Sequence, residues 1–418
     1  LPECVSLEKT ARPSLMCPCC GSRGLTEFYR VEGIPVHSCL LMPTREAALA
    51  YPRDTLQLAY CPACSFITNT AFDPKVHEYS VRYEETQGFS PTFRRFADDL
   101  AKRIVDLYGL RGKHALEVGC GKGEFLAMLC EHGMASGIGL DPSYRPERLN
   151  SPAKERIRFI QDFYGEPYAH LEADLICCRH TLEHIHTPLE FMRMIRRTAG
   201  DRRETLIFFE IPDVVRELHE GAFWDLYYEH CSYFSPASIS ACFERAEFDI
   251  ERVWLEFGDQ YLMITAYPRA GASRTKPPPP RPDARATVEM IERSTQRFAA
   301  RMHWSLEQVR SATDRGERVA LWGSGSKAVS FLTTLGLGDE VAAVVDINPH
   351  RQGTYIAGSG HRIVSPESLR EKPPQLVIVM NPVYVPEITE QIDYDAHGKL
   401  RYKPEHALWA HGEGVYPV

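Results

Sequence analysis

A short strand that runs into a glycine-rich turn constrains the fold of this 418-residue chain more than any other feature. Residues 115–118 read Ala-Leu-Glu-Val, and an apolar run of this kind is typical of a buried parallel strand. Gly119, Gly121 and Gly123 follow, where they permit tight turning and let a ligand approach the backbone. A helix-compatible segment, 125–130, comes next. The sequence therefore predicts a βα unit of a Rossmann-like α/β fold.

The residues around this turn indicate the ligand. A second short strand, 137–140, ends in Asp141, whose carboxylate is well placed to accept hydrogen bonds from a ribose diol. The glycine spacing is G-x-G-x-G, so the dinucleotide fingerprint G-x-G-x-x-G does not fit at Gly119. Glycines also occur in purely structural βα turns. Together with Glu117 before the turn, however, the set resembles the class I S-adenosylmethionine (SAM) methyltransferases.

That resemblance implies that SAM is the cofactor. Gln161-Asp162-Phe163 falls where that family usually contacts adenine. The residues expected in the cofactor site are Glu117, Gly119, Gly121, Asp141, Asp162 and Phe163.

Composition and charge exclude several kinds of partner. The length suits about three average domains, and 44% hydrophobic residues is enough for several cores. The formal net charge of −8 gives no basic surface for a nucleic acid. The sequence contains no run of about 18 apolar residues that would span a membrane, and no charged-then-apolar leader opens it. We therefore expect a small-molecule substrate, no nucleic acid and no membrane.

The cysteines indicate both a compartment and a metal site. There are 13, some in adjacent pairs, which suits a reducing cytoplasm better than a disulfide framework. Two C-x-x-C knuckles can supply four ligands to a structural zinc, and these are Cys17, Cys20, Cys61 and Cys64. Cys19 leaves the register of the first knuckle open, and a redox pair or simply buried thiols are the alternatives. Such a closed site would fold a small module whose own core is thin.

Patterns along the chain indicate the domain boundaries. Apolar residues recur three or four apart in 93–107, which predicts a helix that leads to the first strand. A segment with four consecutive prolines, Pro277–Pro280, is typical of a stiff, exposed linker. The predicted organisation is a zinc-binding module (1–80), a methyltransferase domain (81–268), a proline-rich linker (269–284) and a second Rossmann-like domain (285–418).

A second nucleotide-type unit follows the linker. A helical stretch over about 285–313 precedes a strand at 318–322, the turn Gly323-Ser-Gly-Ser-Lys-Ala328 and a strand at 341–346. This turn is G-x-G-x-x-A with Asp346 about twenty residues further on, which fits the dinucleotide fingerprint formally. Taken alone, this unit predicts an NAD-dependent oxidoreductase, which is the rival hypothesis from a different class.

A cluster of acid/base side chains stands in Tyr227-Tyr-Glu-His230. The paired knuckles, the SAM turn, this cluster and residues 346–353 occur in an order that resembles the three-domain sugar C-methyltransferases along nearly the whole chain. Those enzymes act on nucleotide-linked 4-ketosugars in the biosynthesis of branched deoxysugars. The resemblance implies methylation of carbon next to a ketone. It also implies a C-terminal domain that helps to enclose the sugar nucleotide and carries no NAD.

This chemistry needs a base, because a carbon next to a ketone is not nucleophilic until it loses a proton. A histidine supplies a base of near-neutral pKa, and tyrosine hydroxyls or a second histidine can donate to the enolate oxygen. By resemblance to the family's Tyr-x-Glu-His pattern, we expect His230 to be the base, Glu229 to orient or tune it, and Tyr227 to donate a hydrogen bond. Packing tyrosines and a helix-capping His230 are the alternatives.

Two further catalytic candidates come from other segments. His184 follows the apolar strand 175–178, near the edge of the sheet where open α/β folds bind ligands, and it resembles a family position near the substrate. His180 lies four residues earlier, so a shared metal is an alternative, although no third ligand is evident. Tyr83 resembles a family tyrosine that reaches the site from the N-terminal side, with a packing aromatic as its alternative.

Departures from the resembled family concern the substrate more than the reaction. The family usually carries asparagine at the place of His180 and a Gly-Gly-Ser turn where residues 258–260 read Gly-Asp-Gln. A SAM-dependent O- or N-methyltransferase that acts on another small molecule is therefore the main alternative. A non-catalytic scaffold that merely retains the fold is a third possibility.

Overall fold

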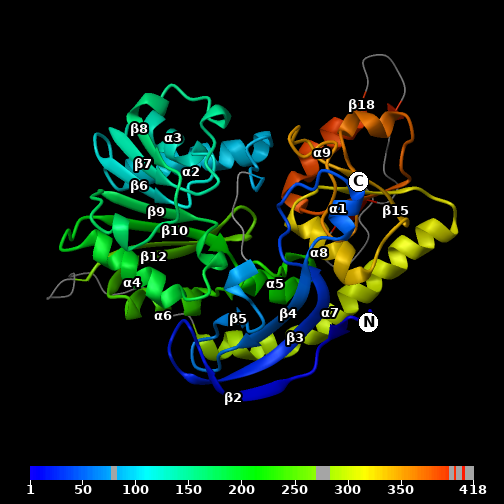
Figure 1. The fold of residues 1–418 in the computed structure, drawn as a ribbon, viewed down its shortest axis with the longest axis horizontal. Coiled ribbons are helices and arrows are strands. Elements are labelled where there is room, and N and C mark those ends of the chain that lie inside the picture. Colours follow the sequence, from blue (N-terminus) through cyan, green and yellow to red (C-terminus); the bar gives the residue numbers. More distant parts are fainter. Residues whose placement is uncertain (77–81, 270–282, 395–399, 402–406, 410–418) are drawn as a thin grey trace.

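The computed structural model describes residues 1–76, 82–269, 283–394, 400–401 and 407–409. Figure 1 shows three sheet-containing parts, with the N-terminal part below the central and C-terminal parts in this view. The predicted linker, 269–284, lies almost entirely outside the described residues, and so does the boundary predicted at residues 80 and 81.

A seven-stranded sheet forms the central part within these residues. Its order is β12-β13-β10-β9-β6-β7-β8, with β12 and β13 antiparallel to their neighbours and the other pairs parallel. The strands are β6 (His114–Val118), β7 (Ser136–Leu140), β8 (Ile157–Ile160), β9 (Leu175–Arg179), β10 (Leu206–Pro212), β12 (Phe248–Glu256) and β13 (Tyr261–Pro268). The strands predicted at 115–118, 137–140 and 175–178 are confirmed, and so is the Rossmann-like fold.

Helices cover both faces of this sheet, which explains why its central strands β9 and β10 are largely apolar. On β9, Leu175 and Cys177 belong to a core shared with α2 (Pro91–Leu107) and α3 (Glu124–Glu131). Ile176 and Cys178 belong to the opposite core, shared with α4 (Pro188–Ala199) and α6 (Pro236–Arg245). The helix predicted over 93–107 is confirmed.

The N-terminal sheet is completed by a strand from the central part. Its own strands are β1 (Val5–Ser6), β2 (Thr10–Met16), β3 (Arg23–Pro35), β4 (Arg53–Tyr60) and β5 (Ile67–Asn69). The sixth strand, β11 (Ser232–Tyr233), pairs with β5 in antiparallel fashion. The module predicted from the cysteine knuckles is therefore built into the central part through backbone hydrogen bonds.

The C-terminal part is a second Rossmann-like unit. Its sheet has the order β16 (Ile363–Val364), β15 (Val341–Val345), β14 (Val319–Trp322), β17 (Leu376–Val379) and β20 (Ala407–Trp409), and all its pairs are parallel. The turn after β14 leads into α8 (Ser326–Leu335). The second strand–turn–helix unit predicted from the sequence is confirmed.

A long helix, α7 (Ala284–Asp314), joins the three parts. It runs along the N-terminal sheet (Figure 1), where the ring of Phe298 packs against Tyr29 with 5.2 Å between centroids. One hydrophobic core contains residues of β3, α7 and the C-terminal sheet together. The thin core expected for the N-terminal module is therefore completed by α7. Among the described helices, α7 included, none is both long and apolar enough to cross a membrane.

Substitution of a glycine tests the close approach of α7 to α5 (Val214–Glu220). Gly221 has φ +66°, and a Cβ there would lie 2.7 Å from the backbone oxygen of Arg297. Gly316 has φ +74°, with no atom within 4 Å of the same position. Both changes to alanine carry the left-handed backbone cost of roughly 1–2 kcal/mol, but only Gly221→Ala adds a clash. We expect calorimetry to show a clearly lower melting temperature for Gly221→Ala than for Gly316→Ala, and equal melting temperatures would contradict this packing.

Candidate active site

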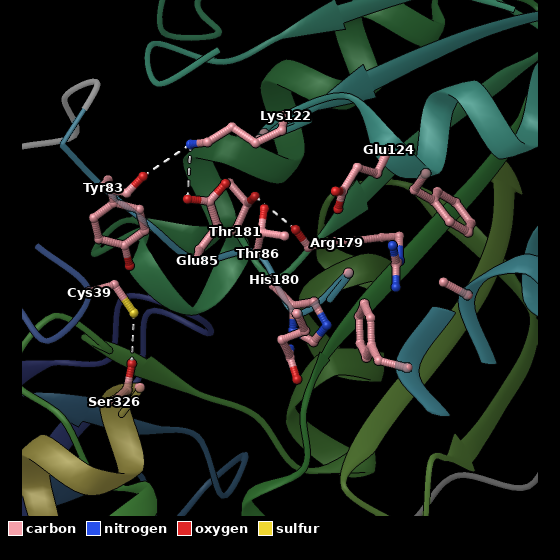
Figure 2. A pocket seen from close by; sticks show the side chains of 18 of the residues that line it. Cys39, Tyr83, Glu85, Thr86, Lys122, Glu124, Arg179, His180, Thr181 and Ser326 are labelled. Carbon is pink, nitrogen blue, oxygen red and sulfur yellow. Dashed lines mark hydrogen bonds and ion pairs between the residues drawn. The ribbon is translucent and has the colours of Figure 1, made fainter. Parts of the chain in front are cut away.

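A cavity of about 1290 Å³ lies where the three parts meet. Its lining comes from the carboxyl ends of β6, β7 and β9, from residues 83–90 and 227–230, and from the turn after β14. Ligands bind at this edge of Rossmann-like sheets. Figure 2 shows part of the wall, with His180 of the central part and Ser326 of the C-terminal part. All the predicted catalytic and cofactor-binding residues line the cavity apart from Glu229.

The glycine-rich turn has the conformation that its sequence predicts. Gly119, Gly121 and Gly123 all have positive φ, at +72°, +53° and +82°. A Cβ at Gly119 would overlap the hydroxyl of Thr181 and lie 2.9 Å from its Cβ. The turn therefore needs glycine for its backbone conformation and for its approach to the neighbouring strand end.

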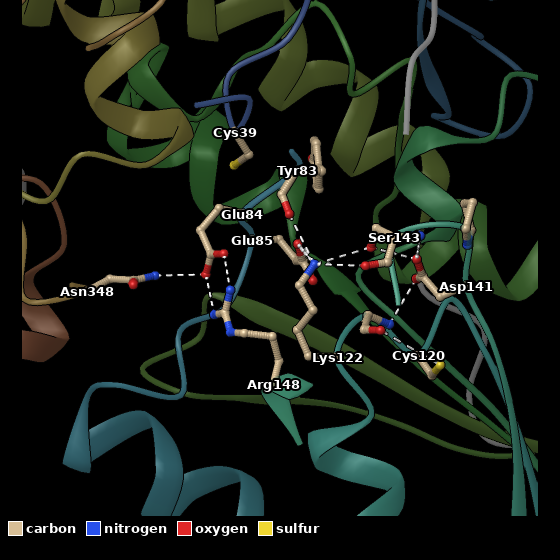
Figure 3. A network of polar contacts seen from close by, with 12 residues as sticks. Cys39, Tyr83, Glu84, Glu85, Cys120, Lys122, Asp141, Ser143, Arg148 and Asn348 are labelled. Atoms are coloured by element: carbon tan, nitrogen blue, oxygen red, sulfur yellow. Dashed lines mark hydrogen bonds and ion pairs between the residues drawn. The ribbon is translucent and has the colours of Figure 1, made fainter. Parts of the chain in front are cut away.

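Asp141 fixes this turn from the end of β7. Its carboxylate accepts hydrogen bonds from the backbone N–H of Gly121 at 2.8 Å and of Ser143 at 2.7 Å (Figure 3). The carboxylate stands at the cavity wall, where the sequence places the ribose of the cofactor. Its contact with a ribose stays a prediction.

The other predicted cofactor residues differ in their exposure. Glu117 is buried, burial raises its pKa to about 8, and its Oε2 has no hydrogen-bond partner among the described residues. An unpartnered buried carboxylate beside a ligand cavity favours a bound donor group at this point.

Phe163 is 58% exposed, and Asp162 accepts a hydrogen bond from the hydroxyl of Tyr168 at 2.5 Å. An exposed phenyl ring at the cavity edge suits stacking on a flat ligand.

Lys122 is a residue of this site that we did not single out from the sequence. Its Nζ is buried and donates to the backbone oxygen of Tyr83 at 3.0 Å, to Glu85 at 3.2 Å and to Ser143 at 3.3 Å (Figure 3). It thereby ties the glycine-rich turn to the segment that carries Tyr83. The only sequence signal was a lysine among the glycines, which is also common on solvated turns.

A second network joins the central and C-terminal parts at Glu84 (Figure 3). Its carboxylate accepts two hydrogen bonds from Arg148, at 2.7 and 2.9 Å, and one from Asn348 of the C-terminal part at 2.9 Å. Burial alone would raise the pKa of Glu84, but Arg148 and Asn348 lower it to about 2. The carboxylate is therefore ionised near neutral pH. It holds in place the segment around Glu84, whose neighbours Tyr83 and Glu85 line the cavity.

The imidazole of His230 faces the cavity and is packed by two rings. The ring of His184 lies edge-on at 4.7 Å and the ring of Tyr227 at 4.6 Å between centroids. Burial lowers the pKa of His230 to about 3, and its ring makes no hydrogen bond within the described part of the chain. His184 Nδ1 lies 3.2 Å from the backbone oxygen of Glu229, which can only accept, so Nδ1 carries the proton. His230 is therefore neutral and open to a ligand.

Glu229 contacts Ser38 and Tyr83 through its carboxylate, and its predicted role in orienting or tuning His230 stays a prediction. Its carboxylate points away from the cavity and accepts hydrogen bonds from the backbone N–H and the hydroxyl of Ser38 and from the hydroxyl of Tyr83 at 3.2 Å. The chain bends at residues 228–229, where the carboxylate of Glu229 meets Ser38 and Tyr83 while the ring of His230 lines the cavity. Glu229 holds Tyr83, which does reach the cavity from the N-terminal side.

Tyr227 is already paired through its hydroxyl. It donates to Asp225 at 2.9 Å, and Asp225 also accepts from Arg216 at 2.6 Å and from Lys327 of the C-terminal part. Burial and the neighbouring Asp225 raise the pKa of Tyr227, while Lys327 and Arg216 outweigh burial and lower the pKa of Asp225. Tyr227 can donate to a substrate only by releasing Asp225.

The histidine pair considered as a metal site is not arranged as one. His180 Nε2 lies 2.9 Å from Glu210, and although burial opposes its charge, Glu210 and Glu183 raise its pKa to about 9. A charged imidazole cannot bind a metal. Ligand atoms of Glu183, His184 and His230 do lie within 4.8 Å of one another, so this trio has the residue types for a metal. The sequence did not indicate that Glu183 and His230 could join His184 in such a site.

The four predicted cysteines form one cluster. Their sulfur atoms lie within 4.8 Å of one another, with 3.7 Å between Cys17 and Cys64 and 3.6 Å between Cys20 and Cys61. Tetrahedral zinc with Zn–S bonds of about 2.3 Å requires sulfur atoms roughly 3.8 Å apart, so the cluster fits this ion. Cys19 lies outside the cluster and its thiol donates to the backbone oxygen of Ser238. The cluster could hold a metal with the register favoured from the sequence.

The second glycine turn is used largely for contacts between parts. Ser324 donates to the carboxylate of Asp346 through its backbone N–H at 3.0 Å. Ser326 exchanges a hydrogen bond of 2.7 Å with Ser38 of the N-terminal part, and Lys327 pairs with Asp225. Ser326 and Lys327 thus join the C-terminal part to the other two parts. Asp346 fixes its own turn as Asp141 fixes the first one.

The sequence matches known families over both of its large parts. Residues 92–253 match the model described as a methyltransferase domain, and residues 285–401 match the one described as a C-methyltransferase C-terminal domain. The C-methyltransferase NovU of Streptomyces niveus is 26% identical in an alignment that covers 92% of this chain and 93% of that protein.

Solved structures are similar over smaller shares of the chain. The riboflavin-type dimethyltransferase RosA of Streptomyces davawensis is 19% identical, with 42% of this chain and 55% of that one covered and a TM-score of 0.34. The 1,6-didemethyltoxoflavin-N1-methyltransferase of Burkholderia thailandensis is 17% identical, with 42% and 79% covered and a TM-score of 0.31. This chain therefore spans about half of the length of RosA.

The central sheet, its glycine-rich turn and the matching domain model define a SAM-dependent methyltransferase. The chain carries the C-methyltransferase C-terminal domain behind that domain and aligns with a C-methyltransferase along most of its length. Its sequence is thus similar to SAM-dependent C-methyltransferases over both large parts and along most of its length.

Lys122→Met tests whether the tie between the glycine-rich turn and Tyr83 supports cofactor binding. The change removes every hydrogen bond of Nζ and leaves Glu85 without its cation. We expect a roughly tenfold weaker SAM affinity in isothermal calorimetry, which corresponds to about 1.4 kcal/mol. Lys113→Met is the matched control, because Lys113 is exposed and pairs only with Asp174 at the surface. SAM affinity within twofold of wild type in both variants would contradict the assignment.

Proposed function

We propose that this enzyme methylates a carbon next to a ketone on a nucleotide-linked deoxysugar, with His230 as the base. The observation that carries the proposal is the neutral imidazole of His230, which makes no hydrogen bond within the described residues and faces the cavity that the glycine-rich turn also lines. A catalytic base must be unprotonated and within reach of the proton that it removes. His230 meets the first condition and is available for the second. With a pKa of about 3 it is a weaker base than the near-neutral histidine expected from the sequence.

The chemistry follows from this placement. His230 takes the proton from the carbon beside the ketone, and the electron pair of that C–H bond forms an enolate. When bound, SAM supplies the methyl group as an electrophile. The enolate carbon would form the new C–C bond while the bond between the methyl group and the sulfonium sulfur breaks and its electron pair stays on sulfur. No proton then has to return to that carbon. The protein contributes mainly position and water exclusion, which the closed, three-part cavity favours.

Tyr83 is the first candidate for a donor to the enolate oxygen. Its side chain is buried at the cavity wall, and its hydroxyl donates to Glu229. Tyr83 can therefore donate to the enolate oxygen only by releasing Glu229, as Tyr227 can only by releasing Asp225. A donor preorganised in a site of low polarity stabilises a developing oxyanion strongly. We assign Glu229 to the positioning of Tyr83 and His184 to the packing and alignment of His230.

The substrate class is supported by size and by the second Rossmann-like part. Single small-molecule sites usually measure about 300–1000 Å³, so a cavity of about 1290 Å³ has room for SAM and a second sizeable ligand. Helix α8 begins at the cavity wall, and helix N-termini favour phosphate groups. A relative named a C-methyltransferase supports carbon as the methylated atom. Zinc is the ion that we assign to the cysteine cluster.

Two alternatives make different predictions. An O- or N-methyltransferase would need a base beside a hydroxyl or an amine, and it would exchange no carbon-bound proton. An NAD-dependent oxidoreductase would need the turn after β14 to be free for a dinucleotide, whereas Ser326 and Lys327 contact Ser38 and Asp225 of the other parts. NAD binding by the purified protein would reopen that hypothesis.

Deuterium exchange tests the base directly. We expect the wild-type enzyme, given SAM and a panel of nucleotide-linked 4-ketosugars in deuterated water, to form a methylated product or to exchange the proton beside the ketone. His230→Asn should reduce the rate at least 100-fold, because general-base catalysis contributes about 10²–10⁴-fold. His303→Asn, an exposed change on α7, is the control. The readout is mass spectrometry.

The outcomes separate the parts of the proposal. Exchange that survives in His230→Asn but disappears in His184→Asn would make His184 the base. Neither methylation nor exchange across the panel, with SAM binding intact, would contradict the ketosugar substrate and leave the methyltransferase.

The pH dependence of kcat/KM tests the neutral state of the base. Burial lowers the pKa of His230 to about 3 from an ordinary value near 6.5, so the free enzyme keeps an unprotonated base well below neutral pH. Activity is lost only when the base gains a proton, that is, as the pH falls through the lowered pKa. We therefore expect kcat/KM to show no loss centred near pH 6.5 between pH 5 and 8. An acid limb near pH 6.5 would contradict a desolvated His230.

A further inference from the structure

We infer that Thr68 and Asn69 of β5 are positioning residues that hold the catalytic loop, residues 227–231, and that the cysteine cluster fixes β5 for this purpose. The inference rests on the proposed function in one respect, because it takes His230 as the catalytic group of the loop. It gives the N-terminal module a task beyond its own folding.

Backbone hydrogen bonds connect β5 to the end of the loop. The backbone N–H of Asn69 donates to the oxygen of Cys231 at 3.1 Å, and the hydroxyl of Thr68 donates to the same oxygen at 3.0 Å. Directly after Cys231, β11 pairs with β5, with Ser232 opposite Thr68. The residue that follows His230 is therefore held by two donors of one strand.

The same strand also holds the beginning of the loop. The side-chain Nδ2 of Asn69 donates to the backbone oxygen of Tyr228 at 3.2 Å, while its Oδ1 accepts from the backbone of Gln57 and Ala71 at 3.1 Å each. Asn69 is 4% exposed, so these bonds are shielded from water. Glu229 and His230 are the two residues between the two anchored carbonyl groups. A backbone fixed on both sides leaves the His230 ring little freedom of direction.

The cysteine cluster determines where β5 begins. Cys64 is separated from β5 only by Ser65 and Phe66, and both of these residues close the knuckle through backbone bonds with Cys61, at 2.9 and 2.8 Å. The ring of Phe66 packs on Phe234 of the segment beyond β11 at 4.9 Å between centroids.

A metal bound by the four thiolates would lock this knuckle and, through it, the strand. Figure 1 shows β5 in the N-terminal sheet, next to the central part. Only Ser65 and Phe66 separate Cys64 from β5, and β5 is bound to the catalytic loop by the buried hydrogen bonds of Thr68 and Asn69. The N-terminal module is therefore directly connected to that loop.

Matched variants at Thr68 test the positioning role. Thr68→Val removes the hydroxyl and keeps the shape, whereas Thr68→Ser keeps the hydroxyl. We expect Thr68→Val to raise amide hydrogen exchange over residues 227–234 at least fivefold and to lower kcat about tenfold. KM, SAM affinity and metal content should stay within twofold of wild type, which also shows that the variant is folded. Thr68→Ser should behave as wild type.

Asn69→Asp provides an independent test. It keeps the oxygen that accepts from Gln57 and Ala71 and loses the donor to Tyr228. We expect the same rise in exchange over the loop and the same fall in kcat. Exchange and kcat at the wild-type level in both Thr68→Val and Asn69→Asp would overturn the inference.

Removal of the metal from the wild-type protein by a chelator tests the link to the cysteine cluster. We expect faster exchange over residues 227–234, with β6 and β7 still protected and SAM affinity within twofold. Unchanged protection of the loop, or loss of protection throughout the protein, would overturn the link. None of these exchange measurements needs a sugar. If the wild-type enzyme methylates no ketosugar but the loop responds as expected, the proposed function fails and the positioning role stands.

Discussion

Buried charges that are compensated across domain boundaries hold this enzyme in one shape. A charge taken out of water is costly unless an opposite charge or hydrogen bonds replace the solvent. Glu84 is satisfied by Arg148 of the central domain and Asn348 of the C-terminal domain together, and Asp225 obtains one of its cations, Lys327, from the C-terminal domain. Since the partners of each carboxylate come from different domains, the domains must close around the cavity to satisfy them.

The same environment gives two neighbouring histidines opposite properties. His180 lies against Glu210 and stays charged, whereas His230 lies among rings and a buried surface and stays neutral. Only an uncharged imidazole can remove a proton, so of these two histidines the surroundings favour His230 for the base that we propose. The charge of His180 is balanced by Glu210 and Glu183, so His180 has a structural role in the wall of the cavity.

The N-terminal module connects the cysteine cluster, which could hold a metal, to the loop that carries His230. A four-cysteine site usually accounts for the folding of a small domain, and here the hydrophobic core of that domain is completed by α7 instead. The knuckle is joined to the loop of His230 through Thr68 and Asn69, so metal binding and the direction of the base are linked by buried backbone hydrogen bonds. Such bonds are strong determinants of geometry because a buried carbonyl left unpaired is costly.

The sequence by itself determined the two strand–glycine turn–helix units, the long helix α7 and the cysteine cluster, because these depend on local spacing and on positive φ at particular glycines. Nearly all the site residues that the sequence predicts line one cavity. The direction of Glu229 was decided only by the tertiary structure, and so were the pairing of Tyr227 with Asp225, the role of Lys122 and the strand β11. Ser38 and Glu229 lie 191 residues apart, and a carboxylate turns toward whichever donors the folded chain places beside it. No local sequence pattern indicates which donors the carboxylate of Glu229 will contact.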